Sequence, residues 1–366
     1  MRGTILTVAE VARNLGGNRP APYGLSLAFT GLRLDVKTNS LTLLRHLADY
    51  FRGFEAAGGP AEITVTALEG PPLHPDLPLT LKEPDPGKDK IKEEYLDLAD
   101  GRLVRKRLTG MVFVFGAARH LALGPCQANP NQVVNFVNNR HLQWMLDQGG
   151  LLFHAAGVSQ GARGLALCGR SGMGKSTLAL HLMSDGLGLI SNDRLVVDRL
   201  PGGLRLRGVA KLPRINPGTA LANPDLAGVI PPEERERFAR LPPDELWDLE
   251  HKYDVPVDEC FGPGRFSLEG DLAGLVILNW ARGAGPALPR RITLAQRPEL
   301  LPAFMKERGA FYLDGDEGLA LGAPPEPADY LALLGGLPVL EIAGGVDFPA
   351  AVAACQALLA GEAPAC

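Results

Sequence analysis

The chain of 366 residues is long enough for two domains and a sizeable core. Its formal net charge of −4 gives no reason to expect a nucleic-acid partner, and no apolar run reaches the length of a membrane span. The N-terminal residues carry no apolar signal segment, and the five cysteines are scattered without CxxC spacing. These features predict a cytoplasmic protein without a membrane partner, a disulfide framework or a zinc site.

The N-terminal part of the sequence predicts strands mixed with two amphipathic helices. The first helix is expected over residues 40–54, with Leu41 on its apolar face. A β-hairpin is expected to turn at Asp100-Gly101. The second helix is expected to be capped by Asn129. This mixture of helices and strands predicts an α/β domain.

A second domain is expected to begin where two strands lead into a glycine-rich loop. We therefore place an N-terminal α/β domain over residues 1–148 and a second domain over residues 149–366. The strand that feeds the loop is the apolar run 165–168, and the helix after the loop is expected to end at Gly186. Farther along, residues 255–261 are expected to form a strand.

The loop reads GRSGMGKS and is a full match to the phosphate-binding, or Walker A, pattern. Its glycines let successive backbone N–H groups form a nest around a phosphate, and Lys175 can reach the β- and γ-phosphate oxygens. The hydroxyl of Ser176 can bind Mg²⁺, and the following helix points its positive end at the same phosphates. The alternative is a glycine-rich turn that opens an ordinary helix. The residues expected to bind ATP are Gly169, Arg170, Ser171, Gly172, Met173, Gly174, Lys175, Ser176 and Thr177.

Asp193 is the first acidic residue on a strand end after this loop. The distance from Lys175 leaves room for one helix and one strand, so Asp193 is expected at the sheet edge where phosphates lie. Its carboxylate can hold Mg²⁺ directly or through water. A strand-end Asp that caps a turn is the structural alternative. The later strand that ends in Asn279-Trp280 has no acid where most phosphate-loop ATPases carry one.

Three further elements flank the loop. The strand before it carries His154, the strand after it ends in Asp193, and the next hairpin ends in Arg207-Gly208. With the loop, these elements resemble the HPr kinase/phosphorylase family, a branch near phosphoenolpyruvate carboxykinases, over residues 150–215. The resemblance implies a P-loop nucleotide-binding domain of the HPr kinase/phosphoenolpyruvate carboxykinase type. It also implies phosphoryl transfer with ATP and Mg²⁺.

The chain as a whole resembles the divergent HprK-related kinase B group, in segments such as KEEYLDLADGRLVRKRLTG. It departs from the HPr kinase pattern at two positions. Asn192 stands where that family has the first acid of a pair, and Arg205 stands where it has a glutamate. The resemblance then leaves Ser176 and Asp193 as the metal ligands, and it leaves the general base open.

The candidate catalytic residues are Asp193, His154 and Arg207. Asp193 can act as a base as well as a metal ligand. His154 can assist proton transfer or touch the γ-phosphate, or it can be an ordinary hydrogen-bonded core residue. Arg207, Lys211 and Arg214 can neutralise the transferred charge or hold an anionic acceptor, or they can belong to a basic surface loop.

We therefore expect a kinase that transfers the γ-phosphoryl group of ATP to a hydroxyl with the help of Mg²⁺. The acceptor can be a serine of a protein or peptide, or a small molecule, and the oligomeric state stays open, a homo-oligomer included. One alternative is a nucleotide-binding regulatory or assembly protein without phosphoryl transfer, which Asn192 and Arg205 favour. A carboxykinase-like decarboxylation ranks last, because it normally needs a transition-metal site and the sequence has no clustered ligands for one.

Overall fold

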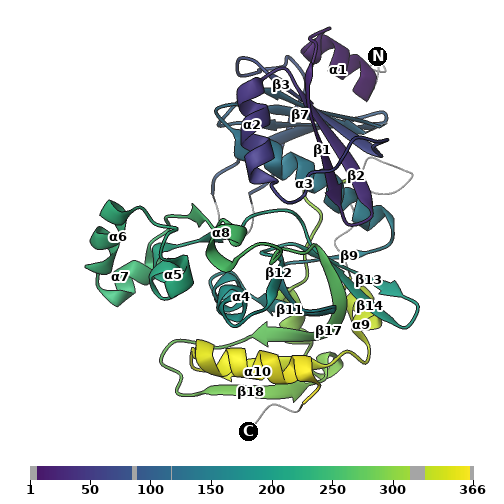
Figure 1. The fold of residues 1–366 in the computed structure, drawn as a ribbon. Helices are drawn as coiled ribbons and strands as arrows, with labels where there is room; N and C mark the ends of the chain where they lie inside the picture. Colours follow the sequence, from purple (N-terminus) through teal and green to yellow (C-terminus); the bar gives the residue numbers. More distant parts are fainter. Residues whose placement is uncertain (1–5, 85–88, 117, 314–325, 363–366) are drawn as a thin grey trace. The chain divides into compact units, whose positions relative to one another are not determined.

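The structure, a computed structural model, is a mixed α/β protein with more than one β-sheet (Figure 1). It describes residues 6–84, 89–116, 118–313 and 326–362. No helix in these ranges is both long and apolar enough to cross a membrane. The chain divides into two compact units. Unit 1 comprises Met1–Gln148 and Arg308–Pro324, and unit 2 comprises Gly149–Glu307 and Pro325–Cys366.

Unit 1 is built on a sheet of eight strands in its described residues, in the order β1-β2-β3-β8-β7-β6-β5-β4. β2, β3 and β8 run parallel, and the other neighbours are antiparallel. The elements are α1 (Val8–Gly16), β1 (Tyr23–Phe29), β2 (Leu32–Thr38), α2 (Leu41–Tyr50), β3 (Ile63–Glu69), β4 (Thr80–Leu81), β5 (Glu93–Leu98), β6 (Gly101–Lys106), β7 (Val112–Gly116), β8 (Arg119–Gly124) and α3 (Pro130–Asp147).

The side chains of β7 alternate between the two faces of this sheet, as the pleat of a strand requires. Val112 and Val114 share a buried core with Val8 of α1. Phe113 points the other way and packs on Phe136 of α3, with ring centroids 4.9 Å apart. Helix α1 therefore covers one face of the sheet, and α3 covers the other.

The elements predicted for unit 1 are confirmed, with local differences. Helix α2 forms, but Leu41 is its first residue and is 41% exposed. The hairpin turns one residue earlier than predicted, because Leu98 already pairs with Gly101. Helix α3 begins after Asn129 as predicted, although the Asn129 side chain makes no capping bond.

A short later segment of the chain also belongs to unit 1. The buried guanidinium of Arg102 donates to the carbonyls of Ala310 and Tyr312, at 3.2 and 2.9 Å, and that of Arg140 donates to Phe311. A buried donor is costly without an acceptor, so these carbonyls hold the segment in unit 1. The predicted boundary at residue 148 assigns this segment to the second domain, and the structure corrects that assignment, because no local sequence pattern marks the return of the chain.

Unit 2 is built on a larger sheet, in the order β12-β10-β11-β17-β14-β13-β9, with β19 also paired to β17 and β18 to β19. Strand β11 lies between antiparallel β10 and parallel β17. The elements are β9 (Leu151–Phe153), β10 (Ala155–Gln160), β11 (Arg163–Gly169), α4 (Lys175–Ser184), β12 (Gly188–Ser191), β13 (Leu195–Leu200), β14 (Gly203–Arg207), β17 (Glu269–Leu278), β18 (Ala287–Ile292), η2 (Leu294–Gln296), η3 (Pro298–Ala303), α9 (Pro327–Leu334), β19 (Val339–Gly344) and α10 (Phe348–Ala360).

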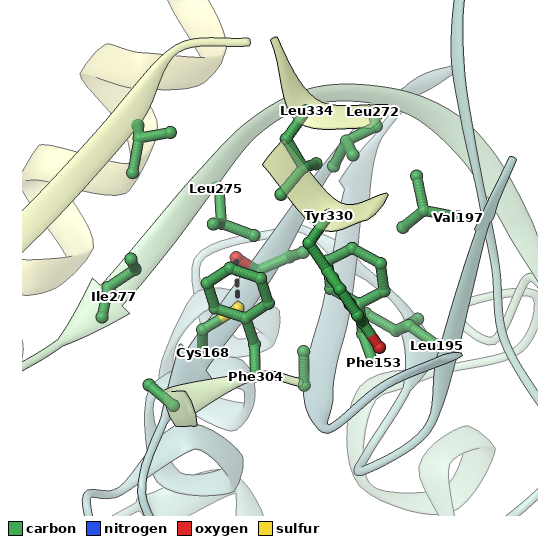
Figure 2. Packing of buried hydrophobic residues seen from close by; sticks show 14 of the residues in the cluster. Phe153, Cys168, Leu195, Val197, Leu272, Leu275, Ile277, Phe304, Tyr330 and Leu334 are labelled. Carbon is green, nitrogen blue, oxygen red and sulfur yellow. Dashed lines mark hydrogen bonds between the residues drawn. The ribbon is translucent and has the colours of Figure 1, made fainter. Parts of the chain in front are cut away.

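Two buried cores lie on opposite faces of this sheet. Cys168 of β11 belongs to the core in which the rings of Phe304 and Tyr330 pack, with centroids 5.8 Å apart (Figure 2). Leu167, the preceding residue, belongs to the other core with Leu178 of α4 and residues of α10. The strand before the loop is therefore buried on both faces, which agrees with its predicted apolar run.

The chain between β14 and β17 forms a mostly helical segment, residues 214–261, which we call the helical segment. It packs on α4 through a core that joins Leu180 of α4 to Ile215 and Phe238. The strand predicted over residues 255–261 is wrong: the chain forms the short helix α8 there, because so short an apolar run does not distinguish the two. The elements are β15 (Arg214–Ile215), α5 (Pro217–Leu221), η1 (Pro224–Leu226), α6 (Pro232–Ala239), α7 (Pro243–Asp248), β16 (Tyr253–Asp254) and α8 (Val257–Phe261).

Candidate functional site

The glycine-rich loop connects β11 to α4, as the predicted strand and helix require. Gly172 and Gly174 have φ angles of +83° and +84°, a region that glycine adopts without strain. The indole Nε1 of Trp280 donates to the carbonyl of Met173 at 3.0 Å, and a Cβ on Gly174 would lie 2.9 Å from the ring of Phe348. The first N–H groups of a helix have no acceptor within the helix. The loop therefore has the backbone features of an anion site at the start of α4.

Lys175 lies under the loop and is 8% exposed. Its Nζ donates to the carbonyl of Gly169 at 2.7 Å and to that of Arg170 at 3.3 Å. Burial lowers the pKa of Lys175, and the carboxylate of Asp193 opposes that shift. A phosphate bound in the loop would compete with these two carbonyls for the ammonium group.

The loop opens on a cavity of about 450 Å³. The cavity brings the loop together with the two residues that follow β12 and with residues of β15, α5 and α10. Most of the predicted site residues line it, whereas Gly169, Arg170, Met173 and Arg207 do not. The lining residues are His154, Ser171, Gly172, Gly174, Lys175, Ser176, Thr177, His181, Asn192, Asp193, Lys211, Arg214, Ile215, Asn216, Gly218, Thr219, Ala222, Leu246, Lys252 and Phe348.

Several buried oxygen atoms at this cavity have no hydrogen-bond partner among the described residues. They are the Oδ1 atoms of Asn192, Asp193 and Asn216. Asn216 occupies the N-cap position of α5, yet its side chain makes no capping bond. Buried polar atoms are almost always satisfied in folded proteins, so a group of unsatisfied acceptors beside a cavity is the pattern expected of a ligand site.

Asp193 is the one carboxylate among the described residues that line the cavity. Burial disfavours its charged form, but Lys211 and Arg194 together hold its pKa below the usual value. The Nζ of Lys211 lies 4.0 Å from Asp193 Oδ2. Asp193 is therefore an anion at neutral pH, ready to meet a cation.

The oxygen atoms present fit a magnesium ion. Mg²⁺ prefers oxygen ligands and is usually held by one or two carboxylates together with substrate phosphates. Ser176 and Asp193 line the cavity together with the amide oxygens of Asn192 and Asn216. Among the described residues, no group of three or more His, Cys, Asp and Glu side chains could hold a metal by itself. Ser176 and Asp193 would be the side chains that hold such an ion, with phosphate oxygens and water completing its ligands.

His154 follows β9 and lines the cavity. Its backbone N–H donates to the carbonyl of Phe304 at 2.8 Å, which fixes the main chain at this point. Burial, with Lys175 and Arg194 nearby, lowers the pKa of His154 to about 4. The imidazole is therefore neutral at pH 7 and is a weak base.

Arg207 lies in the sheet and not at the cavity. It is 1% exposed, and its Nη2 lies 3.0 Å from Oδ2 of Asp198 on the neighbouring strand β13. Arg205 binds the same carboxylate at 2.6 and 3.1 Å. Gly208 follows at a point where a Cβ would lie 2.0 Å from the carbonyl oxygen of Ile190, one residue before the end of β12. Arg207 therefore holds β14 against β13, and Gly208 lets the chain pass close to β12, so that both lie beside the strands that flank Asp193 in the sequence.

Sequence reasoning did not identify Asn216, Thr219, Lys252 or Phe348 as site residues. The Thr219 hydroxyl lies 3.0 Å from that of Thr177, which connects α5 to the first turn of α4. These residues belong to no motif, and only the packing of the helical segment and α10 on α4 brings them to the cavity. Their sequence positions carried no signal that could have identified them.

Comparisons with known proteins add little to this geometry. No protein-family model matches the chain, and no curated protein matches it. Among solved structures, the chain is similar to the Hpr(Ser) kinase/phosphatase from Coxiella burnetii, with 12% sequence identity and a TM-score of 0.26. That similarity covers 54% of this chain and 79% of the other. A TM-score at this level does not establish a shared fold.

Proposed function

We propose that this protein is an ATP-dependent kinase of the HPr kinase-like type, which transfers the γ-phosphoryl group to a hydroxyl with the help of Mg²⁺. The observation that carries the proposal is the cavity itself. It joins Lys175 and Ser176 of the loop to Asp193 of a different strand end, beside buried oxygen atoms that have no partner among the described residues. Positioning and charge neutralisation are most of what phosphoryl transfer requires.

Each residue has a role in this proposal. The loop N–H groups and Lys175 would bind the β- and γ-phosphates, and Ser176 and Asp193 would hold Mg²⁺. The bound ion supplies positive charge at the phosphate oxygens. The acceptor oxygen forms a bond to the γ-phosphorus while the bond to the β–γ bridging oxygen breaks and ADP leaves. In this proposal the Asp193 carboxylate would take the hydroxyl proton, and neutral His154, which lines the same cavity, would orient the acceptor.

The experiment that tests the proposal is transfer of label from γ-labelled ATP. The full-length protein is incubated with Mg²⁺, labelled ATP and a lysate of its source cells, and the protein and small-molecule fractions are analysed separately. Label in a new species is the expected result, and it should depend on Mg²⁺. Lys175→Met and Asp193→Asn serve as controls, because each removes one proposed contact with the phosphates or the metal.

The alternative is a nucleotide-binding regulatory protein without transfer, which Asn192 favours because it leaves a single carboxylate at the site. Binding of a fluorescent ATP analogue is measured in parallel to separate the two. Tight binding without any labelled product would favour the regulatory alternative. Absence of nucleotide binding would refute both.

A further inference from the structure

Positive charge exceeds negative charge along the lining of the cavity. The cations are Lys175, Lys211, Arg214 and Lys252, whereas Asp193 is the one acid among the described lining residues. Lys175 lies at the loop, and Lys211 lies 4.0 Å from Asp193. In the proposed reaction these two cations face the nucleotide phosphates and the metal ligand. The proposed reaction assigns no role to Arg214 and Lys252, which belong to the helical segment.

The fold brings Arg214 and Lys252 together from distant parts of the chain. Strands β15 and β16 pair antiparallel, with Arg214 opposite Asp254, so that Lys252 lies just before the paired strand. The pairing is extended by a hydrogen bond of 2.8 Å from the Val255 N–H to the carbonyl of Pro213. The two cations therefore belong to a supported ribbon and not to an unattached loop.

Both Arg214 and Lys252 keep donor groups that can bind a ligand. Arg214 meets Asp254 through Nε at 3.1 Å, and both side chains are about half exposed, so the pair is a weak one. The two terminal nitrogens of a guanidinium carry further N–H donors in a fork that matches phosphate or carboxylate oxygens. Lys252 is exposed at the cavity. Together they offer a fork and a point charge to one anion.

We propose that the phosphoryl acceptor is an anionic hydroxyl compound, whose phosphate or carboxylate group is held by Arg214 and Lys252. This inference rests on the proposed kinase function and adds the substrate class to it. A group held there would place the acceptor in the cavity that Asp193 and Lys211 also line. The loop would then remain free to bind the phosphates of the nucleotide.

The test uses inorganic phosphate as the probe and the full-length protein. The loop is first saturated with Mg²⁺ and the non-transferable ATP analogue AMP-PNP, and phosphate is then titrated by calorimetry. Saturable phosphate binding to the wild type is expected. The double variant Arg214→Met/Lys252→Met should weaken it by about ten- to a hundredfold, the effect of losing charge-assisted hydrogen bonds. Lys252→Glu should weaken it further than Lys252→Met, because it adds repulsion.

Arg240→Met is the matched control. Arg240 follows α6 in the same helical segment, pairs with Glu236 at the surface and does not line the cavity. Arg240→Met removes one arginine charge from the same segment outside the cavity and should leave phosphate binding unchanged. Affinity for AMP-PNP should stay within about threefold in every variant, because the proposal assigns the nucleotide phosphates to the loop and not to these residues.

The outcomes separate the inference from the function on which it rests. If AMP-PNP binds but phosphate does not, the anionic acceptor is overturned and the kinase proposal stands. The anionic acceptor is also overturned if Arg240→Met lowers the affinity for phosphate as much as the double variant does. It is overturned as well if the double variant loses affinity for AMP-PNP and for phosphate to the same extent. If AMP-PNP does not bind the wild type, the kinase proposal fails, and the inference fails with it.

Discussion

Substitutions in the ion pair between Asp198 and Arg207 test whether Arg207 stabilises the sheet or takes part in the reaction. Asp198 is 9% exposed and binds two arginines, of which Arg207 is 1% exposed and Arg205 is 26% exposed. Burial lowers the pKa of Arg207, and the Asp198 carboxylate opposes that shift. Asp198→Ala removes this carboxylate from a buried guanidinium, which costs about 3–5 kcal/mol of unfolding free energy.

Arg205→Ala is the matched comparison, because it breaks the more exposed half of the same cluster. It should cost about 1 kcal/mol or less, since solvent can replace much of the lost interaction. The double variant Asp198→Leu/Arg207→Met removes both buried charges and should recover most of the loss of Asp198→Ala. Urea unfolding followed by circular dichroism measures all three. Equal costs for Asp198→Ala and Arg205→Ala would refute the burial argument.

The same double variant tests the catalytic role that the sequence analysis expects of Arg207. A folded double variant that still transfers phosphoryl groups at close to the wild-type rate would make Arg207 a structural residue. A folded variant that binds ATP normally but transfers it at least a hundredfold more slowly would support the catalytic role, since loss of one preorganised charge has that scale. The structure favours the first result, because Arg207 does not line the cavity.

Three further predictions concern residues that line the cavity, and a fourth concerns Gly208 in the sheet beside it. Lys175→Met should weaken ATP binding by about a hundredfold, because it removes charge-assisted hydrogen bonds to phosphate, and a fluorescent analogue titration that overlays the wild type would contradict it. Asp193→Asn should abolish Mg²⁺-dependent transfer while ATP affinity falls by less than about tenfold, and an unchanged Mg²⁺ titration of activity would remove Asp193 from the metal site. Gly208→Ala should cost about 3 kcal/mol in urea unfolding, because its Cβ would lie 2.0 Å from the carbonyl oxygen of Ile190; a cost below about 1 kcal/mol would be inconsistent with that contact. The pKa of His154 is lowered to about 4, so the unfolded chain binds the proton more tightly, and stability should fall as the pH drops from about 6.5 to about 4. His154→Gln should make that fall shallower, and an identical pH profile of unfolding free energy would argue against the shift.

The sequence by itself determined the features that depend on neighbouring residues. An apolar run, a glycine-rich octapeptide and a helical repeat predict β11, the loop and α4 in order, and all three form where they were expected. The end of α4 follows from the same kind of local signal. Gly186 has a φ of +102°, and the N–H of Leu187 donates to the carbonyl of Leu182 at 3.1 Å, the bond that closes such helix ends. Each of these signals lies within a few residues of the structure that it specifies.

Tertiary structure alone decided which distant residues meet. The pairing of β15 with β16 places Lys252 near Arg214, and the burial of Arg207 depends on the strand that carries Asp198. Contacts of this kind join residues whose separation leaves no periodic pattern, because the side chains are brought together by the packing of whole elements and not by backbone geometry. The glycine-rich loop was therefore predictable from its own residues, and Lys211 and Arg214 were predicted from the basic run that carries them, whereas the presence of Lys252 at the same cavity was not.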